Sequence, residues 1–257
     1  MSLSRRRDFL KSVTTLGIAA AASSQNLIGK NYHEKGRPEP VNDLTFLFQG
    51  DSITDGNRSR DNDWNHVMGH GYQYIIASKL WYDFPGRGLH FFNRGVSGNK
   101  ITDLADRWQS DTLALRPDVL SILIGINDIE AWIHGDQIST PEKYESGYRS
   151  LLEKTKQELP NVQLVLGEPF LFPVGRVKDK WEEYLSEVQK RQAIVKRLSN
   201  DFAAIHIKYQ SSFNKALEKA PPEYWIWDGI HPMPAGHELM ALEWMKQVNK
   251  KMNLYVS

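Results

Sequence analysis

Residues 119–128 read Val-Leu-Ser-Ile-Leu-Ile-Gly-Ile-Asn-Asp, an apolar run that passes through a glycine into two polar residues. Residues 44–52, Leu-Thr-Phe-Leu-Phe-Gln-Gly-Asp-Ser, follow a similar order, and residues 162–166 form a third apolar run. Short, near-continuous apolar runs are typical of strands that are buried on both faces of a sheet. The three runs therefore predict the centre of a sheet that is covered by helices on both sides.

Longer amphipathic segments alternate with these strands along the chain. Further strands are predicted at residues 89–92 and 203–207, and helices at residues 71–82, 102–115, 142–158, 178–200 and 235–250. The last helix opens after Pro234, and its apolar face is expected to hold Leu239, Leu242 and Met245. Strands that alternate with helices, with about five parallel strands in all, predict a single three-layer α/β/α domain over residues 43–257. Ligands of such domains bind at the carboxyl ends of the strands, so catalytic residues are expected directly after strands.

The N-terminal residues 1–24 have the order of an export signal peptide. Arg6 and Arg7 precede an apolar stretch from Val13 to Ala22, and residues 6–11 resemble the twin-arginine motif. The stretch is too short to cross a hydrocarbon core of about 30 Å, so no stable membrane insertion is expected. Residues 25–42 are polar, contain two prolines and are predicted to be a linker. The mature protein is therefore expected to be exported, to the periplasm or the outside of a bacterial cell.

The composition excludes several classes of function. Of the 257 residues 40% are hydrophobic and 25% are charged, as in soluble globular proteins. Lys and Arg number 32 against 31 Asp and Glu, so the chain offers no basic excess for the phosphates of a nucleic acid. The absence of cysteine excludes a thiol nucleophile, disulfides and a Cys-rich zinc site.

Three polar motifs follow predicted strands. Gly50-Asp51-Ser52 places a serine at a strand end, where it can be an exposed nucleophile or cap the next helix. Residues 93–99, Asn-Arg-Gly-Val-Ser-Gly-Asn, hold two glycines that allow backbone N–H groups to approach a ligand. Asn127 leaves the third strand, and its amide can face developing negative charge or cap a turn. No lysine follows this motif in a phosphate-loop pattern, and no third glycine completes a dinucleotide-binding fingerprint, which argues against nucleotide binding.

A fourth motif, Asp228-Gly-Ile-His231, lies just before the last predicted helix. An aspartate three residues before a histidine can hold the Nδ1–H of the imidazole while Nε2 faces a nucleophile. The pattern is common by chance, but together with a serine after the first strand it predicts a Ser-His-Asp site above the sheet.

The four motifs, in this order, make the chain resemble the SGNH or GDSL-like hydrolase family of serine esterases. The resemblance covers about residues 45–245, with Ile53 where the family name has leucine. It implies a flavodoxin-like sheet and ester hydrolysis without a cofactor, with Ser52, His231 and Asp228 as the catalytic triad. It also implies an oxyanion hole formed by the N–H groups of Ser52 and Gly95 and the side-chain amide of Asn127.

Two short patterns in the sequence partly match metal sites. Asp55, Asn57 and Ser59 begin like a calcium loop, but the sixth and twelfth positions hold arginine and histidine. His66 and His70 are four residues apart, as zinc ligands on a helix can be, but the neighbouring glycines favour a loop. No metal is therefore expected, and His206 and His237 are expected to serve structure.

The substrate is the least determined part of the sequence interpretation. Trp64 and Trp227 would place aromatic faces beside the site, where sugar rings can stack, although packing of the loops would explain them equally. Together with Asp51 and Asp128 they are the candidate substrate-binding residues. Polar loops and the lack of a long apolar segment favour short acyl esters, such as acetyl groups on carbohydrates. The alternatives are a lysophospholipase or thioesterase and a non-catalytic carbohydrate-binding domain, and the oligomeric state stays open.

Overall fold

The computed structural model describes residues 42–60 and 68–255. Its centre is a five-stranded parallel sheet in the order β2-β1-β3-β4-β5. The strands are β1 (Thr45–Gly50), β2 (His90–Asn93), β3 (Val119–Leu123), β4 (Gln163–Gly167) and β5 (Ile205–Ile207). The predicted strand number, direction and positions are confirmed. The predicted export signal and nearly all of the linker lie outside the described residues and stay predictions.

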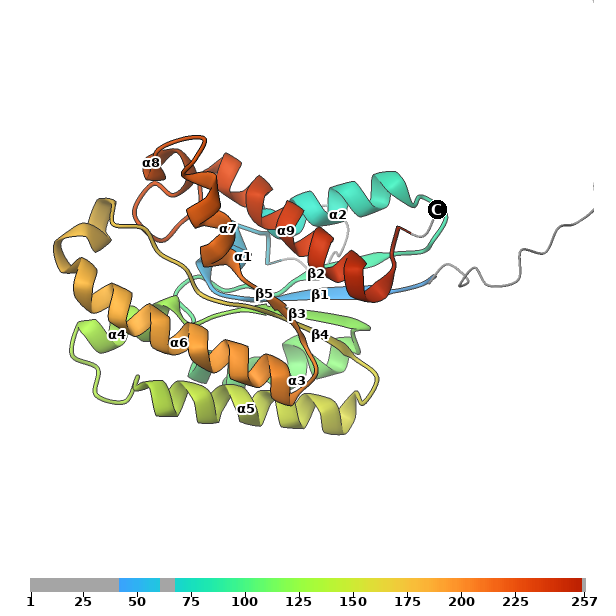
Figure 1. The fold of residues 1–257 in the computed structure, drawn as a ribbon. Helices are drawn as coiled ribbons and strands as arrows, with labels where there is room; N and C mark the ends of the chain where they lie inside the picture. The colour runs from blue at the N-terminus through green and yellow to red at the C-terminus, as the bar shows by residue number, and fades with distance from the viewer. Residues whose placement is uncertain (1–41, 61–67, 256–257) are drawn as a thin grey trace, which may run out of the picture. The chain divides into compact units, whose positions relative to one another are not determined.

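Helices cover both faces of the sheet (Figure 1). The α2, α7 and α9 helices lie on one face, and α3, α5 and α6 lie on the other. The helices are α1 (Ser52–Asp55), α2 (Tyr72–Asp83), α3 (Ile101–Asp111), α4 (Ile126–Ile133), α5 (Pro141–Glu158), α6 (Trp181–Asp201), α7 (Tyr209–Ala216), α8 (Pro222–Trp225) and α9 (Pro234–Met252). Two 3₁₀ turns, Leu113–Leu115 and Gly175–Lys180, complete them. The predicted three-layer α/β/α architecture is therefore confirmed.

The two-sided burial of the strands follows from their side-chain alternation. Phe46 and Phe48 of β1 point into the core beneath α2 and α9, whereas Leu47 points into the core beneath α3 and α5. Ser121, the one polar residue in the β3 run, accepts a hydrogen bond from Trp244 Nε1 of α9 at 3.0 Å. Buried polar groups of this kind need a partner, and the indole supplies it.

Two sequence predictions about helices differ from the structure. The helix expected over residues 102–115 ends at Asp111, because Gln49 donates to the Asp111 carbonyl and to the Thr112 hydroxyl at the point where the helix stops. The expected apolar face of α9 is wrong at Leu242, which is 53% exposed. The core side of α9 is instead occupied by Met240, Trp244 and Val248, which bury larger rings and chains against the sheet.

The strand order reverses beside β1, since β2 lies on one side of it and β3 on the other. In open parallel sheets the loops at the carboxyl ends of such strands diverge to opposite faces and leave a crevice between them. The loops after β1, β2 and β3 carry the serine, glycine and asparagine motifs, so the topology brings these motifs to one edge of the sheet.

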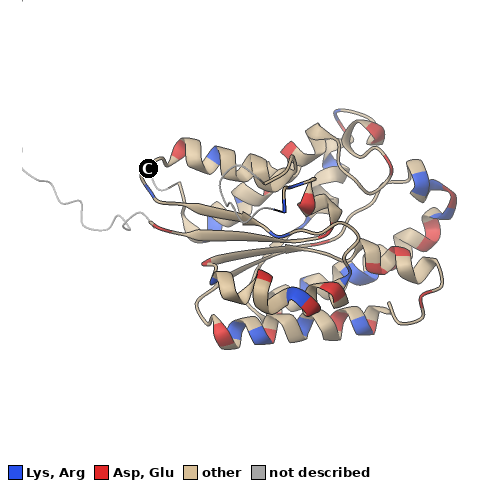
Figure 2. Ribbon diagram, turned by 180° about the vertical axis from the view of Figure 1, so that it is seen from behind, with Lys and Arg blue, Asp and Glu red and all other residues tan. Residues whose placement is uncertain are grey.

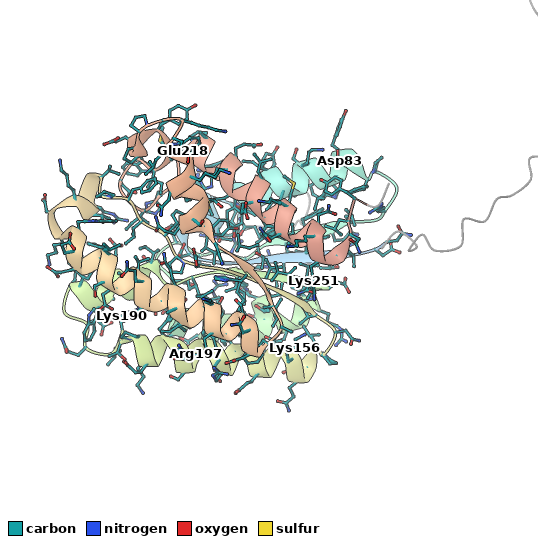
Figure 3. All side chains as sticks on the ribbon, viewed as in Figure 1. Asp83, Lys156, Lys190, Arg197, Glu218 and Lys251 are labelled. Atoms are coloured by element: carbon teal, nitrogen blue, oxygen red, sulfur yellow. The ribbon has the colours of Figure 1, made fainter. Side chains whose placement is uncertain are left out.

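The outer surface carries charges of both signs. Acidic and basic residues alternate along the outer helices (Figure 2), and the side chains of Lys190 and Arg197 point outward from α6 (Figure 3). Arg197 of α6 pairs with Glu145 of α5, and Arg149 of α5 pairs with Asp201 of α6, which links the two helices across their solvent side. No helix within residues 42–60 or 68–255 is long and apolar enough to span a membrane.

Candidate active site

The serine motif forms a tight turn between β1 and α1. The Asp51 carboxylate accepts the Ile53 N–H at 3.1 Å and caps α1, so that Ser52 is the first residue of the helix. Gly50 is required before it, because a Cβ atom there would lie 2.3 Å from the carbonyl oxygen of Leu123. The Ser52 N–H has no acceptor among the described residues and remains open at the helix start.

The second component is the loop between α8 and α9. It is closed by an antiparallel bridge between Ile226 and Pro232 and by the Trp227 N–H, which donates to the His231 carbonyl at 3.2 Å. Within this loop Asp228 Oδ1 accepts the N–H groups of Ile230 at 3.0 Å and His231 at 2.7 Å. The loop therefore fixes the orientation of the Asp228 carboxylate.

Ser52, His231 and Asp228 form one hydrogen-bonded chain. Ser52 Oγ lies 2.8 Å from His231 Nε2, and His231 Nδ1 lies 2.7 Å from Asp228 Oδ2. Burial by itself would raise the pKa of the Asp228 carboxyl, but its hydrogen bonds with the His231 ring and backbone outweigh burial and lower the pKa to about 2. An ionised Asp228 fixes the His231 tautomer with Nε2 as acceptor toward the serine, the arrangement that general-base activation needs.

Asn127 lies in the first turn of α4, directly after β3. Its Nδ2 donates one proton to the Asn99 carbonyl at 3.0 Å, so the amide is oriented by the loop that follows β2. The second proton on Nδ2 has no acceptor within the described residues. The helix can start here because Gly125 adopts φ +127°, a backbone conformation that residues other than glycine rarely adopt.

Gly95 does not have the free N–H group that the sequence interpretation assigned to it. Its N–H donates to Asn93 Oδ1 at 2.9 Å, and a Cβ at this position would lie 2.4 Å from the Asp55 nitrogen. Gly95 therefore serves the close packing of the β2 loop on α1. Gly98, three residues later, is exposed at φ +83° in a turn closed by Asn99 N–H to Val96 O at 3.2 Å. Its own N–H has no acceptor in the described part of the chain.

Asp55 joins the serine loop to the glycine loop. Its Oδ2 accepts from the N–H and the hydroxyl of Ser97, each at 2.9 Å, and from Arg60 at 2.6 Å. Burial would raise the pKa of the Asp55 carboxyl, but Arg60 and Ser97 stabilise the charged form and lower it. The sequence singled out Asp55 only as a possible calcium ligand. Asp55 and Ser97 are far apart in the sequence, so no short motif predicts their contact.

Asp51 and Asp128, expected beside the substrate, are buried at 1% and 2% exposure. Burial raises the pKa of Asp51 to about 7 and that of Asp128 to about 6. Asp128 accepts the N–H of Ile101 with both oxygens at 3.3 Å, which ties the start of α3 to α4. These carboxyl groups have structural partners and no open surface to offer a substrate, which corrects the expectation.

Of the two tryptophans expected to bind substrate, the structure describes Trp227 and not Trp64. Trp227 is 60% exposed, and its ring stacks beside that of His231 at 6.2 Å between centroids and 25° between planes. Trp64 lies outside the described residues. Trp227 therefore presents an open aromatic face next to the serine and histidine.

Of the two histidines considered as zinc ligands, the structure describes only His70. His66 lies outside the described residues, and His70 faces His237 edge to face at 6.5 Å. His237, in α9, accepts the Tyr72 N–H at 3.2 Å, and burial lowers its pKa to about 4. Within residues 42–60 and 68–255 no three His, Cys, Asp or Glu side chains gather as a metal site would need.

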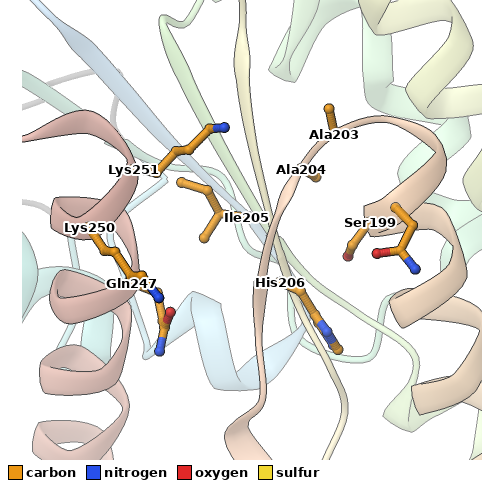
Figure 4. Close-up of a pocket in the computed structure, with 9 residues that line it drawn as sticks. Ser199, Ala203, Ala204, Ile205, His206, Gln247, Lys250 and Lys251 are labelled. Atoms are coloured by element: carbon orange, nitrogen blue, oxygen red, sulfur yellow. The ribbon is translucent and has the colours of Figure 1, made fainter.

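A hollow of about 500 Å³ opens at the β5 edge of the sheet, between α6 and α9 (Figure 4). His206, Lys250 and Lys251 are among the residues that line it, and none of the residues of the serine, glycine, asparagine or histidine motifs does. His206 lies in β5 with its Nε2 3.2 Å from Glu168 Oε2. The hollow is therefore separate from the candidate site.

The GDSL-like lipase/acylhydrolase family model matches residues 48–239, which contain the serine, glycine, asparagine and histidine motifs. The chain belongs to this family. An acetylxylan esterase from Geobacillus stearothermophilus is 32% identical over 211 residues, which cover 79% of this chain and 93% of the relative. A crystal structure of that esterase shares 30% identity at a TM-score of 0.72, over 80% of this chain and 94% of its own. A GDSL-like lipase structure from Parabacteroides merdae shares 40% identity at a TM-score of 0.78, over 82% and 98%. The protein is accordingly an ester-bond hydrolase with the α/β architecture of these relatives.

Proposed function

We propose that this protein is a serine esterase that works through Ser52, His231 and Asp228 by way of an acyl-enzyme. The hydrogen-bonded chain from Ser52 Oγ to Asp228 Oδ2 is the observation that carries the proposal. His231 takes the Ser52 proton as Oγ attacks the ester carbonyl, and returns it to the departing alkoxide. Water then attacks the acyl-enzyme with the same histidine as base. None of these steps draws on a cofactor.

The oxyanion of the tetrahedral intermediate would accept hydrogen bonds from the Ser52 N–H, the free proton of the Asn127 amide and the Gly98 N–H. Gly98 takes the place first given to Gly95, because its N–H is open and a side chain is absent at an exposed turn. A donor of this kind contributes about 3 to 4 kcal/mol to transition-state stabilisation.

The substrate that we propose is a short acyl ester, an acetyl group, on a carbohydrate. The supporting observations are the likeness to an acetylxylan esterase and the exposed Trp227 ring beside His231. A flat aromatic face suits the apolar face of a sugar ring. Trp64 is retained as a second candidate for such stacking, and no nucleic acid or lipid bilayer is among the proposed partners.

Acetate release separates this proposal from its alternatives. The purified protein should release acetate from acetylated xylo-oligosaccharides and turn over 4-nitrophenyl acetate better than the octanoate. A fatty chain buries about 0.8 kcal/mol per CH₂, so an enzyme built for one would gain kcat/KM steeply with chain length. An octanoate preference of about tenfold without acetate release would indicate a lysophospholipase or thioesterase. Glycan binding without any turnover would indicate a carbohydrate-binding domain.

We also propose that the protein works outside the cytoplasm, in the periplasm or beyond. The support is the twin-arginine-like segment at residues 6–11, followed by its apolar stretch and the polar residues 25–42. Acetylated polysaccharides are substrates that an exported enzyme can reach.

A further inference from the structure

The loop that contains Asp228 interlocks with the loop that follows β4. Gly175 adopts φ +55°, and a Cβ there would lie 2.5 Å from Asp228 Cα. Gly229 adopts φ +95°, and a Cβ there would lie 2.6 Å from the Val174 carbonyl. Phe172 N–H donates to the Gly229 carbonyl at 3.0 Å, and Arg176 N–H donates to the Asp228 carbonyl at 3.1 Å. This contact fixes the backbone of Arg176 beside the Asp228 carboxylate.

The side chain of Arg176 lies between two carboxylates. Its Nε is 3.3 Å from Asp228 Oδ2, the same oxygen that faces His231 Nδ1, and its Nη1 is 3.5 Å from Glu130 Oε1 of α4. Tyr184 of α6 donates its hydroxyl to Glu130 Oε1 at 3.3 Å. The Arg176 guanidinium thus connects Asp228 to Glu130, which belongs to α4 and is hydrogen-bonded to α6.

We propose that Arg176 is a positioning residue that balances the charge of the Asp228 carboxylate, and that Glu130 sets how strongly it does so. The inference rests on the proposed role of His231 as general base. An unbalanced Asp228 carboxylate would stabilise the imidazolium form of His231 and hold its proton. The Arg176 cation offsets part of that attraction and so favours release of the imidazole proton. Glu130 in turn offsets part of the Arg176 charge.

Other titratable groups face this site and complete the charge balance. Asp51, before α1, is buried with its pKa raised to about 7, and His237, from α9, has a pKa lowered to about 4 by burial. Burial, followed by the neighbouring Glu130, raises the pKa of Tyr184 to about 12. His237 and Tyr184 therefore stay neutral between pH 5 and 9, which leaves Asp51 and the neighbouring Asp128, whose pKa burial raises to about 6, as the groups that can add their own titrations.

The experiment compares the acid limb of kcat/KM with an NMR titration of the His231 imidazole in matched variants. Arg176→Gln should shift both midpoints upward by roughly 0.3 to 1 pH unit, and Glu130→Gln should shift both downward by a similar amount. Arg176→Lys keeps the charge and should stay near the wild-type midpoint. Lys178→Gln, which removes a cation from the same 3₁₀ turn, should shift neither midpoint. High salt should shrink the shifts, because Arg176 is half-exposed and its charge is screened.

Opposite shifts in Arg176→Gln and Glu130→Gln are the signature that a purely structural role would not give. Equal shifts in the two variants, or a shift in Lys178→Gln as large as in Arg176→Gln, would overturn the inference. The NMR titration needs no substrate, so it reports on Arg176 even if ester turnover is absent. A failure of the esterase proposal and a failure of this inference are therefore seen in different measurements.

Discussion

Single side chains of the site are held by partners from more than one loop. Asp228 accepts two backbone N–H groups from its own loop and the imidazole of His231, and it pairs with Arg176 from the loop after β4. Asn127 is oriented by the Asn99 carbonyl of the glycine loop. Because these groups are oriented before a substrate arrives, little reorganisation is needed as charge develops.

The Asn127→Ala variant tests the amide in the oxyanion hole. Its kcat should fall by roughly 10² to 10³ with KM little changed, since the free proton of the amide is assigned to the transition state and not to the bound ester. Steady-state kinetics with 4-nitrophenyl acetate measures this. A rise in KM at constant kcat would instead make Asn127 a substrate-binding residue.

The Asp51→Asn variant tests the cost of a buried carboxylate. With its pKa raised to about 7, folded Asp51 binds a proton between about pH 4 and 7 that the unfolded chain has released. The stability of the wild-type protein therefore falls as pH rises through this window. Asn keeps an acceptor for the Ile53 N–H, so the variant should melt about 3 to 8 °C above wild type at pH 8.

The Asp51→Asn difference should shrink toward zero at pH 4, which calorimetry at several pH values can follow. Asp179→Asn, at an exposed position, is the matched control and should show no such trend. A variant less stable than wild type at pH 8 would mean that the buried carboxylate has a partner that an amide cannot replace.

Among whole elements, the strands were the most predictable from sequence, because burial on both faces gives apolar runs that no surface segment needs. Helices with few apolar contacts were not predicted. The α7 helix has Tyr209 and Phe213 as its large buried residues, too few to establish a period of 3.6 residues. The α4 helix begins inside the asparagine motif, where the sequence indicates a strand end with a turn or helix cap but no apolar period for the helix itself.

The candidate site was predictable to the extent that its groups lie in short motifs. Two of them, Ser52 and Asn127, come shortly after strands, and the other two, Asp228 and His231, come just before the last helix. The choice between Gly95 and Gly98 depends on which N–H the Asn93 side chain occupies, and this is visible only in the folded loop. Arg176 and Glu130 meet Asp228 from distant parts of the chain and carry no motif.

The contact between the serine loop and the glycine loop can be tested at Asp55. Asp55→Asn replaces one acceptor oxygen by a donor opposite Ser97 or Arg60, so the turn that carries Gly98 should lose its position. We expect kcat to fall at least about tenfold, with a smaller change in KM. Ser97→Ala, which removes only the hydroxyl contact, should have a milder effect. Unchanged kcat in Asp55→Asn would show that the glycine turn is positioned without this carboxylate.

For the whole molecule, the parallel sheet gathers the loops after β1, β2 and β3 at one edge, and the histidine loop joins them through the contact between Ser52 and His231. From that loop α9 leads back over one face of the sheet (Figure 1). The proposed export of the chain by its N-terminal segment can be tested at the two arginines of that segment. Arg6→Lys with Arg7→Lys should leave the full-length precursor in the cytoplasm, as fractionation and immunoblotting can show. Export of the double variant would indicate the general secretory route.

The central claim is that Ser52 is the nucleophile that forms an acyl-enzyme. The most direct measurement is intact-mass and peptide analysis of the protein after reaction with an organophosphonate ester. One phosphonyl group should appear on the peptide that contains Ser52, and ester hydrolysis should be lost in step with labelling. Ser52→Ala should take up no label and hydrolyse no ester, while its melting temperature stays within a few degrees of wild type. Label on another residue, or turnover retained by Ser52→Ala, would contradict the account.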